Sequence, residues 1–276
     1  MVKLKNNELL IKAQERMLDI LIEVDRVCSK HNINYFLTDG TLLGAVRHKG
    51  FIPWDDDVDI GMLREDYNKF IEIASYELGE DYFLQSIETD PNYNRFHIPL
   101  KVRDNRSKLV EVDETENEKF NQGIYIDIFA FDTLPKNKVI RKLQKLISRF
   151  LVLCDVRTRR KEENLNLQNK IAFLVYSIFK KIPYKKRNKV LRYIMKWNDK
   201  NGEEVTYGVD LPCDGSWGKI LNKSDIFPLT KIEFCKYMFN APKNYDKVLK
   251  IIYGDYLTLP KEEDRRWHAK KIEIYE

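Results

Sequence analysis

The sequence has few cysteines and no long hydrophobic run, and these absences exclude several classes of protein. The longest apolar stretch, residues 171–179, has nine residues and is interrupted by Ser177, so it is far shorter than a bilayer span. The N-terminal residues have no apolar core followed by a small-residue cleavage site, which predicts no secretory signal. The cysteines form no CxxC or CxxH pair and are interpreted as reduced cytosolic thiols: Cys28, Cys154, Cys213 and Cys235.

The length and composition are those of a globular protein. A chain of 276 residues is long enough for one large domain or two small ones, and it can bury a core without a disulfide or a metal. Hydrophobic residues make up 43% and charged residues 33%, which excludes a disordered polyelectrolyte and a polytopic membrane protein.

The charge is distributed unevenly along the chain. The net charge is +5, but residues 136–200 contain 20 Lys and Arg against 4 Asp and Glu, a net charge of +16. The remaining 211 residues therefore carry −11. This basic block on an acidic protein predicts a compositional boundary and a partner of negative charge.

Hydrophobic periodicity predicts a mixture of helices and strands outside the basic block. We expect helices over residues 9–31, 42–48 and 66–78, with Asp66 as an N-cap, and strands over residues 33–37, 58–62, 96–102, 109–112 and 124–131. Within the block, helical spacing covers residues 139–152, 171–180 and 190–197. The tail from residue 216 onwards is mixed, with prolines between short helices. Together these patterns favour an α+β or α/β core.

The most informative segment, residues 37–60, contains four aspartates within five residues. In an extended chain Asp55, Asp57 and Asp59 lie on one face and Asp56 on the other. Carboxylates on one face raise one another's pKa unless a cation neutralises them. Because Val58 and Ile60, on either side of Asp59, are apolar, we expect a half-buried site for Mg²⁺ or Mn²⁺. The alternative is a solvated acidic loop.

A glycine turn lies shortly before the acidic segment. Asp39, Gly40 and Thr41 leave a predicted strand and open a helix, so their backbone N–H groups face outwards at the positive end of the helix dipole. A diphosphate bound there would be bridged by metal to Asp57 and Asp59. Alternatively, Gly40 is only a turn residue.

A third carboxylate is expected on a neighbouring strand. Asp127 lies between Ile126 and Ile128 in an apolar segment, where a charge is costly without a partner. It is therefore the candidate for completing a metal site with the acidic segment. The alternative is an edge strand on which Asp127 faces water, because Tyr125 and Phe129 share its face.

These motifs together resemble a known family. A glycine and a small hydroxyl residue, an Asp-x-Asp and an isolated Asp between hydrophobic residues resemble the nucleotidyltransferase superfamily. The longer motifs at residues 40–48 and 52–60 resemble the LicD family of phosphocholine transferases, to which the fukutin-type phosphoribitol transferases are related. The resemblance extends to residues 64–67, 125–129 and 253–256 and to Pro260, on both sides of the basic block.

The resemblance implies an α+β fold, a nucleotidyltransferase-like mixed sheet flanked by helices, with a basic helical insertion. The implied organisation is a catalytic core over residues 1–135, the insertion over 136–200 and a C-terminal part over 201–276 that completes the catalytic domain. The implied activity is the metal-dependent transfer of phosphocholine from CDP-choline to a sugar hydroxyl of a cell-surface glycan precursor, of teichoic acid or lipopolysaccharide type, with release of CMP.

Site roles follow from the resemblance by position. Asp57 and Asp59 would bind Mg²⁺ or Mn²⁺, and Asp127 would complete the site and orient or deprotonate the acceptor hydroxyl. The turn at Gly40 and Thr41 would hold phosphate.

The donor's remaining groups also need partners. Candidate counter-charges for phosphate are Arg47, Lys101 and Arg103, each of which is otherwise a surface ion pair. Trp54 is the candidate for a choline cage, because ring faces bind a quaternary ammonium, with Trp217 and Tyr256 as further possibilities. Any of these aromatic residues can instead belong to the core.

The basic block has the pattern of helices that lie on an anionic membrane. We expect a cytoplasmic protein, peripherally bound to the inner face of the plasma membrane, that meets a polyprenyl-linked glycan acceptor there and binds no nucleic acid. A packed helical subdomain with outward charges is the alternative. Competing functions are a phosphoribitol or phosphoglycerol transferase, an NTP-dependent nucleotidyltransferase and a non-catalytic membrane adaptor.

Overall fold

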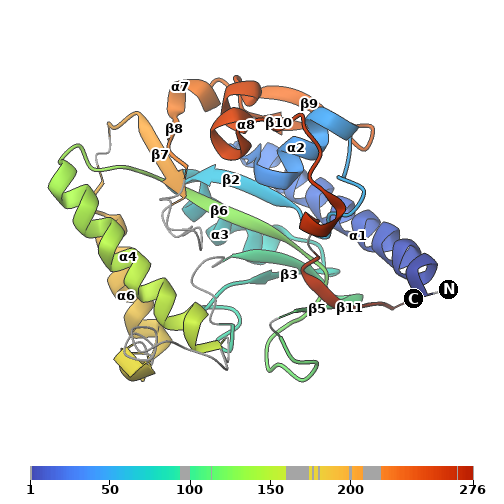
Figure 1. Cartoon of the computed structure of the whole chain (residues 1–276), viewed down its shortest axis with the longest axis horizontal. Helices are drawn as coiled ribbons and strands as arrows, with labels where there is room; N and C mark the ends of the chain where they lie inside the picture. Colours follow the sequence, from blue (N-terminus) through green and yellow to red (C-terminus); the bar gives the residue numbers. More distant parts are fainter. Residues whose placement is uncertain are drawn as a thin grey trace.

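The computed structural model describes residues 2–93, 100–112, 114–159, 174–175, 177–179, 181–198, 201–207, 219–265 and 267–275 (Figure 1). The helices are α1 (Val2–Lys30), α2 (Asp39–His48), α3 (Arg64–Glu77), α4 (Lys138–Arg159), α6 (Tyr184–Met195), α7 (Lys223–Ile226), α8 (Tyr245–Tyr253) and the short 3₁₀ helix η1 (Glu262–Asp264). The strands are β1 (Phe36–Leu37), β2 (Asp59–Leu63), β3 (Tyr82–Gln85), β4 (Lys101–Asp104), β5 (Ser107–Glu111), β6 (Tyr125–Thr133), β7 (Glu204–Tyr207), β8 (Leu221–Asn222), β9 (Thr230–Phe234), β10 (Tyr237–Ala241) and β11 (Ala269–Ile274).

Within the described residues, seven strands form one mixed sheet. Its main order is β1-β2-β6-β4-β3, and β7 and β8 extend it from the far end of β6. The pair β2 and β6 is parallel, whereas the other pairs are antiparallel. The long strand β6 is therefore interior and lies between β2 and β4. The mixed α/β architecture agrees with the expected mixture of strands and helices.

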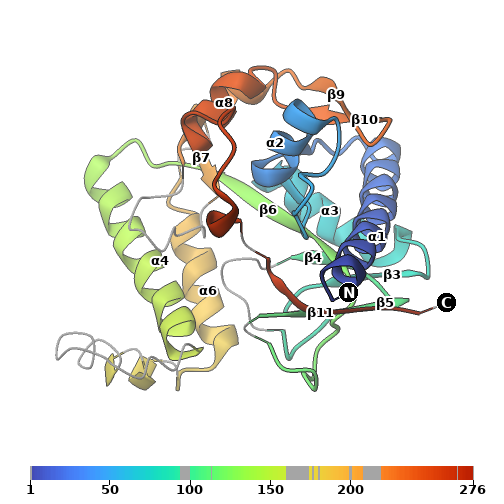
Figure 2. The same ribbon diagram turned by 45° about the vertical axis from the view of Figure 1, so that its right-hand side comes forward.

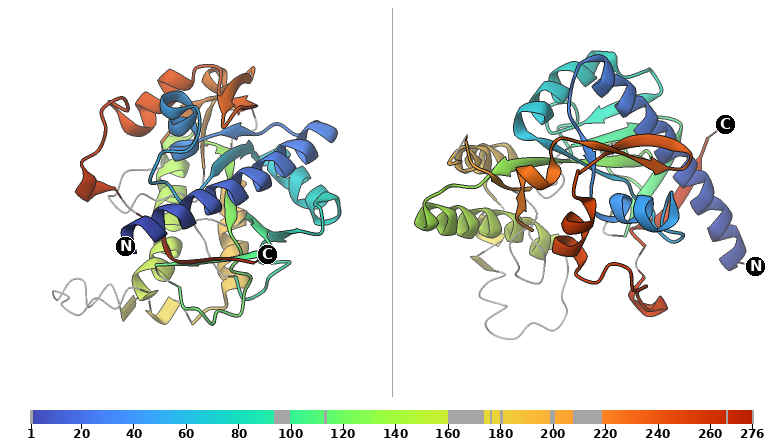
Figure 3. Two further views of the ribbon diagram at one scale, coloured as in Figure 1. Left: turned by 90° about the vertical axis from the view of Figure 1, so that its right-hand side faces the viewer. Right: turned by 90° about the horizontal axis from the view of Figure 1, so that it is seen from above.

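Helix α1 supplies much of the core. Met17, Ile20, Leu21, Val24 and Cys28 recur every three or four residues, and all are buried. This spacing places them on one helical face, as the sequence predicts. The helix contacts β4, β6 and α3, and β11 crosses alongside it (Figure 3).

Several element boundaries differ from the prediction. Helix α2 begins at Asp39 rather than residue 42, because the helical hydrogen bonds begin directly after β1, with the Leu42 N–H donating to the Thr38 carbonyl at 3.0 Å. Asp66 is not an N-cap: α3 begins at Arg64, and the Asp66 carboxylate accepts the backbone N–H of Asn34 instead. Of the strand expected over 96–102, residues 96–99 lie outside the described residues.

The tail contains strands that the sequence analysis did not predict. Strands β9 and β10 form a hairpin, and β11 pairs antiparallel with β5. The turn between β9 and β10 places Cys235 and Lys236 at φ values of 51° and 70°. Hairpin turns of this kind usually use glycine or asparagine, so the sequence lacks the usual signal.

The basic block forms a pair of helices to one side of the sheet. Helices α4 and α6 lie side by side in Figures 1 and 2, at the end of β6 that is remote from α1. The chain enters the block after β6 and leaves it before β7, which pairs with β6. Among the helices that are described, none has the length and apolar character needed to cross a bilayer.

Candidate active site

Two neighbouring parallel strands bring Asp59 and Asp127 together. Asp59 is the first residue of β2 and is the register partner of Asp127 on β6. In addition, the Asp127 backbone N–H donates to the carbonyl of Val58 at 2.8 Å. Since side chains at paired positions share one face of a sheet, the two carboxylates are neighbours. The placement expected for the third carboxylate is therefore the one that the structure shows.

Asp127 is buried, and a buried lysine neutralises it. The Lys101 ammonium lies 2.7 Å from Asp127 Oδ1 and 3.2 Å from Glu111 Oε1. It also lies 3.2 Å from the ring centre of Tyr125. The alternative in which Asp127 faces water from an edge strand is wrong, because β6 is paired on both sides. The alternative prediction that Lys101 forms a surface ion pair is also wrong, because Lys101 is buried beside Asp127.

The acidic loop, residues 55–58, precedes β2 and places more negative charge beside Asp59 and Asp127. Burial, followed by Asp57 and Asp56, raises the pKa of Asp55 to about 8. Burial also raises the pKa of Asp59 well above its usual value, and Asp57, Asp39 and Asp127 add to this effect. Burial raises the pKa of Asp127 to about 6, although Lys101 opposes the shift. The site therefore carries more negative charge than its own cations neutralise.

The start of α2 contacts this loop directly. The Thr41 hydroxyl accepts the backbone N–H of Asp59 at 2.7 Å. A Cβ on Gly40 would come within 2.8 Å of Asp55 Oδ2, so only glycine leaves room for that carboxylate at the start of the helix. Thr41 thus binds the backbone of Asp59, and Gly40 leaves space for the Asp55 carboxylate. The expected contact of Gly40 and Thr41 with phosphate stays a prediction.

Asp56 binds the segment before β11 and shares His268 with Asp57. Its carboxylate is fully buried and accepts the backbone N–H groups of His268 and Ala269 at 2.8 and 2.6 Å. The His268 ring lies 3.1 Å from Asp56 and 3.3 Å from Asp57, and these hydrogen bonds raise the pKa of His268 to about 11. These hydrogen bonds hold residues 268–269 against the acidic loop. The sequence analysis did not predict this contact.

The candidate aromatic residues have different environments. Trp54 is half-buried, and the Arg265 guanidinium lies 4.1 Å from the centre of one of its rings. Tyr256 is buried, and its hydroxyl donates to Asp246 at 2.7 Å, so it belongs to the core and not to a cage. Trp217 lies outside the described residues. Of the two that are described, Trp54 is the one that directly precedes the acidic loop in the sequence.

The two candidate arginines are held by other contacts. Arg103 is fully buried and donates to Gln85 at 2.6 Å and to the Gly123 carbonyl at 2.7 Å, so its guanidinium has no exposed surface for a phosphate. The alternative prediction that Arg103 forms a surface ion pair is also wrong, because its side chain is buried. Arg47, in the last turn of α2, donates to the Tyr256 carbonyl at 3.1 Å and remains partly exposed.

The donor set suits a hard divalent cation. Asp55, Asp57, Asp59 and Asp127 offer only carboxylate oxygens, which Mg²⁺ and Mn²⁺ prefer. In the part of the chain that the structure describes, no three acidic, histidine or cysteine side chains already have the arrangement of a metal site. Binding therefore requires the carboxylates to turn towards a common centre. The raised pKa values give the physical reason for them to do so.

Comparison with known proteins agrees with this geometry. Residues 32–153 match the family model described as "LicD/FKTN/FKRP, nucleotidyltransferase domain". The chain is 30% identical over 259 residues to the lipopolysaccharide cholinephosphotransferase LicD of Haemophilus influenzae, covering 91% of this chain and 92% of that protein. The chain belongs to the LicD family. The LicD-type motifs at residues 40–48 and 52–60 are the ones that build the start of α2 and the acidic loop.

A shorter match links the chain to the fukutin-related branch. The ribitol 5-phosphate transferase FKRP of Homo sapiens is 45% identical over 47 residues, which is 17% of this chain and 10% of that protein. The FKRP of Mus musculus matches to the same extent. These matches agree with the relationship inferred from the motifs, but they cover little of the FKRP chains.

Proposed function

We propose that this LicD-family protein transfers a phospho-alcohol, specifically phosphocholine from CDP-choline, to a sugar hydroxyl of a cell-surface glycan precursor, releasing CMP. The observation that carries the proposal is the pairing of Asp59 with Asp127 inside an acidic cluster built from the family's motifs. The near full-length similarity to a lipopolysaccharide cholinephosphotransferase supports the choice of donor and acceptor. A teichoic acid or lipopolysaccharide precursor carried on a polyprenyl lipid is the expected acceptor.

Asp57, Asp59 and Asp127 are the residues that would hold Mg²⁺ or Mn²⁺. When bound, the cation would neutralise the diphosphate of the donor. Phosphoryl-type transfer depends mainly on positioning and charge neutralisation, which matches a site built of fixed carboxylates.

The chain's other groups position these carboxylates. Lys101 fixes Asp127 on β6, and Thr41 fixes the backbone of Asp59 at the start of β2. Asp56 ties the segment before β11 to the loop. Arg47, partly exposed at the end of α2, is the remaining candidate for a contact with donor phosphate.

Trp54 is the residue proposed to bind the choline headgroup. A quaternary ammonium has no hydrogen to donate and is held by ring faces. In this structure the Arg265 guanidinium takes a ring face of Trp54. Choline binding at that face therefore requires Arg265 to move.

The test is turnover measured as CMP release from CDP-choline with Mg²⁺ or Mn²⁺ and a glycan acceptor. We expect Asp59→Asn and Asp127→Asn each to lower kcat/KM by about 1,000-fold, equivalent to about 4 kcal/mol. Glu72→Gln, at an exposed carboxylate on α3 outside the family's motifs, is the matched control and keeps wild-type turnover. Folded Asn variants with near-normal turnover would contradict the proposal.

A second candidate donor is CDP-ribitol, which the match to the FKRP proteins favours. Thermal-shift titration with Mn²⁺ and CDP-choline, CDP-ribitol or ATP separates the possibilities, because a ligand stabilises the state that binds it. Stabilisation by CDP-choline supports the proposal. Stabilisation by CDP-ribitol or by ATP alone would replace it with the corresponding transferase, and stabilisation by none would favour an adaptor.

A further inference from the structure

Helix α4 exposes apolar side chains and buries polar ones. Val139, Leu143 and Leu146 are 76%, 46% and 65% exposed. Gln144 and Ser148 are each only 1% exposed. In an ordinary surface helix the arrangement is the reverse. The apolar residues therefore do not serve the packing of this helix.

The helical geometry separates these two sets. At about 100° per residue, Val139, Leu143 and Leu146 fall within an arc of roughly 60°, and Ile140, which is 40% exposed, widens it to roughly 120°. Gln144 and Ser148 lie about 150° from the centre of the first three. The Gln144 amide donates to the Ile194 carbonyl of α6 at 2.9 Å, so this polar side is the one that packs. The apolar stripe therefore lies on the side of α4 opposite Gln144.

Helix α6 shares part of this pattern, although it also buries the apolar Ile194. Arg187 and Asn188 are buried, whereas Val190 and Tyr193 are exposed. Tyr193 packs against Trp197, which follows the helix, with ring centres 6.0 Å apart. Both helices of the pair thus present apolar side chains outwards.

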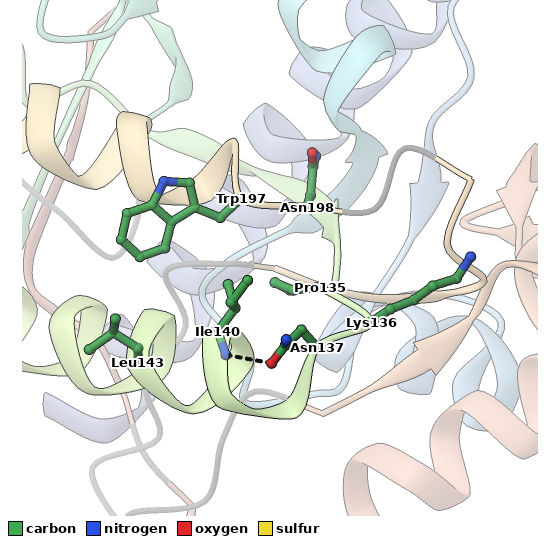
Figure 4. A pocket seen from close by; sticks show the side chains of 7 residues that line it. All are labelled: Pro135, Lys136, Asn137, Ile140, Leu143, Trp197 and Asn198. Atoms are coloured by element: carbon green, nitrogen blue, oxygen red, sulfur yellow. Dashed lines mark hydrogen bonds between the residues drawn. The ribbon is translucent and has the colours of Figure 1, made fainter.

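An apolar groove lies between the start of α4 and the residues that follow α6. Ile140 and Leu143 of α4 line it together with Trp197, Pro135 lies beside Ile140, and the groove has a volume of about 660 Å³ (Figure 4). Lys136 lies at its rim in the same view. The groove is therefore apolar inside with a cation at its edge.

Exposed basic side chains run beside the apolar rows: Lys138, Lys142, Lys185, Lys186, Lys189, Arg192 and Lys196. The whole block carries a net charge of +16. Apolar and basic stripes side by side match a surface that offers both acyl chains and anionic headgroups. A nucleic acid offers no partner for the apolar stripe, and a second copy of so basic a surface would repel the first.

We propose that helices α4 and α6 form a docking surface for an anionic lipid bilayer. The apolar stripes of Val139, Leu143 and Leu146 and of Val190 and Tyr193 enter the headgroup region. The flanking lysines contact anionic headgroups. The docking surface follows the end of β6, which at about 3.3 Å per residue is roughly 20 Å from Asp127. It is thus separate from the carboxylate site, and the proposal does not depend on which reaction that site performs.

Vesicle sedimentation tests the proposal with the full chain. Phosphatidylcholine vesicles with 30% phosphatidylglycerol are compared with pure phosphatidylcholine, at low and high salt. We expect at least tenfold tighter binding to the anionic vesicles, weakened by salt because the headgroup attraction is screened. Equal binding to both vesicle types, or binding to neither, would overturn the proposal.

Matched variants locate the surface. Leu143→Glu with Leu146→Glu is expected to weaken vesicle binding at least tenfold, whereas Ile11→Glu, at an exposed apolar position of α1, leaves it unchanged. Likewise, Lys142→Glu with Lys189→Glu weakens binding, and Lys12→Glu on α1 leaves it unchanged. If the α1 variants lose as much binding as the α4 and α6 variants, the proposed location is wrong.

Two further measurements separate this proposal from its rivals. CMP release from soluble CDP-choline is expected to be unchanged in Leu143→Glu with Leu146→Glu, so loss of vesicle binding is distinguishable from damage to the carboxylate site. Sedimentation velocity shows whether the wild type is monomeric without lipid. A wild-type dimer that these substitutions dissociate, with no vesicle binding, would assign the surface to self-association instead.

Discussion

The acidic loop and the α4–α6 pair reverse the usual distribution of side chains in opposite ways. At the loop, carboxylates crowd together inside the protein, and burial raises the pKa of Asp55 and Asp59. On α4, aliphatic side chains such as Leu146 are exposed while Gln144 is buried. Each arrangement costs free energy in the isolated chain. We propose a ligand for each region: a cation with a phosphate at the loop, and a membrane surface at the helices.

The largest expected difference between the two regions concerns their ion pairs. Lys101→Met removes one member of the buried pair with Asp127, and breaking such a pair leaves an unpaired buried charge. We expect the free energy of unfolding to fall by about 3 kcal/mol. Arg192→Met removes an exposed pair between α6 and Glu88 and costs about 0.5 kcal/mol. Urea unfolding measures both, and equal losses would break the comparison.

The two glycines of the motif at residues 40–48 are expected to affect different properties. Substitution of Gly44 should lower stability, whereas substitution of Gly40 should lower activity. A Cβ on Gly44 would lie 2.5 Å from the Gly50 carbonyl oxygen, so Gly44→Ala must move backbone and is expected to cost about 2 kcal/mol of stability. A Cβ on Gly40 meets only the Asp55 side chain. Gly40→Ala therefore leaves the melting temperature nearly unchanged but lowers CMP release at least tenfold. Full activity in a folded Gly40→Ala protein would contradict its place at the site.

Trp54 and Arg265 test the donor headgroup. Trp54→Ala is expected to raise the KM for CDP-choline about tenfold, in line with the loss of a desolvated cation–π contact. Arg265→Ala frees the ring face and is expected to lower the inhibition constant of free choline, because the competing guanidinium is gone. Inhibition kinetics with choline and ribitol provide the measurement. An equal response to both compounds would remove Trp54 from headgroup recognition.

The smallest effect is expected from the exposed apolar residues. Leu146→Gln is predicted to change the free energy of unfolding by no more than about 0.5 kcal/mol, because the side chain packs against little. Gln144→Ala, on the buried side of the same helix, is predicted to cost about 1 kcal/mol through loss of its bond to Ile194. A large loss for Leu146→Gln would show that the apolar stripe of α4 serves the fold and not a membrane.

The residues that sequence reasoning found are those with a local signal. The spacing of Asp57 and Asp59 and the isolated Asp127 between isoleucines were readable because a charge in an apolar strand is unusual. The bond between Asp56 and His268 was not, because 212 residues separate them and no local pattern marks the histidine. Arg265 was missed for the same reason. For Arg103 the charge was visible, but its burial follows from tertiary packing that the sequence pattern does not reveal.

The most direct test of the central claim is Mn²⁺ binding, measured by electron paramagnetic resonance on the purified chain without substrate. We expect saturable binding in the wild type and in the control Glu72→Gln. We expect binding at least a hundredfold weaker in Asp59→Asn and in Asp127→Asn, with circular dichroism showing that both remain folded. Unchanged Mn²⁺ affinity in these two folded variants would contradict the claim that the paired carboxylates of β2 and β6 hold a divalent cation.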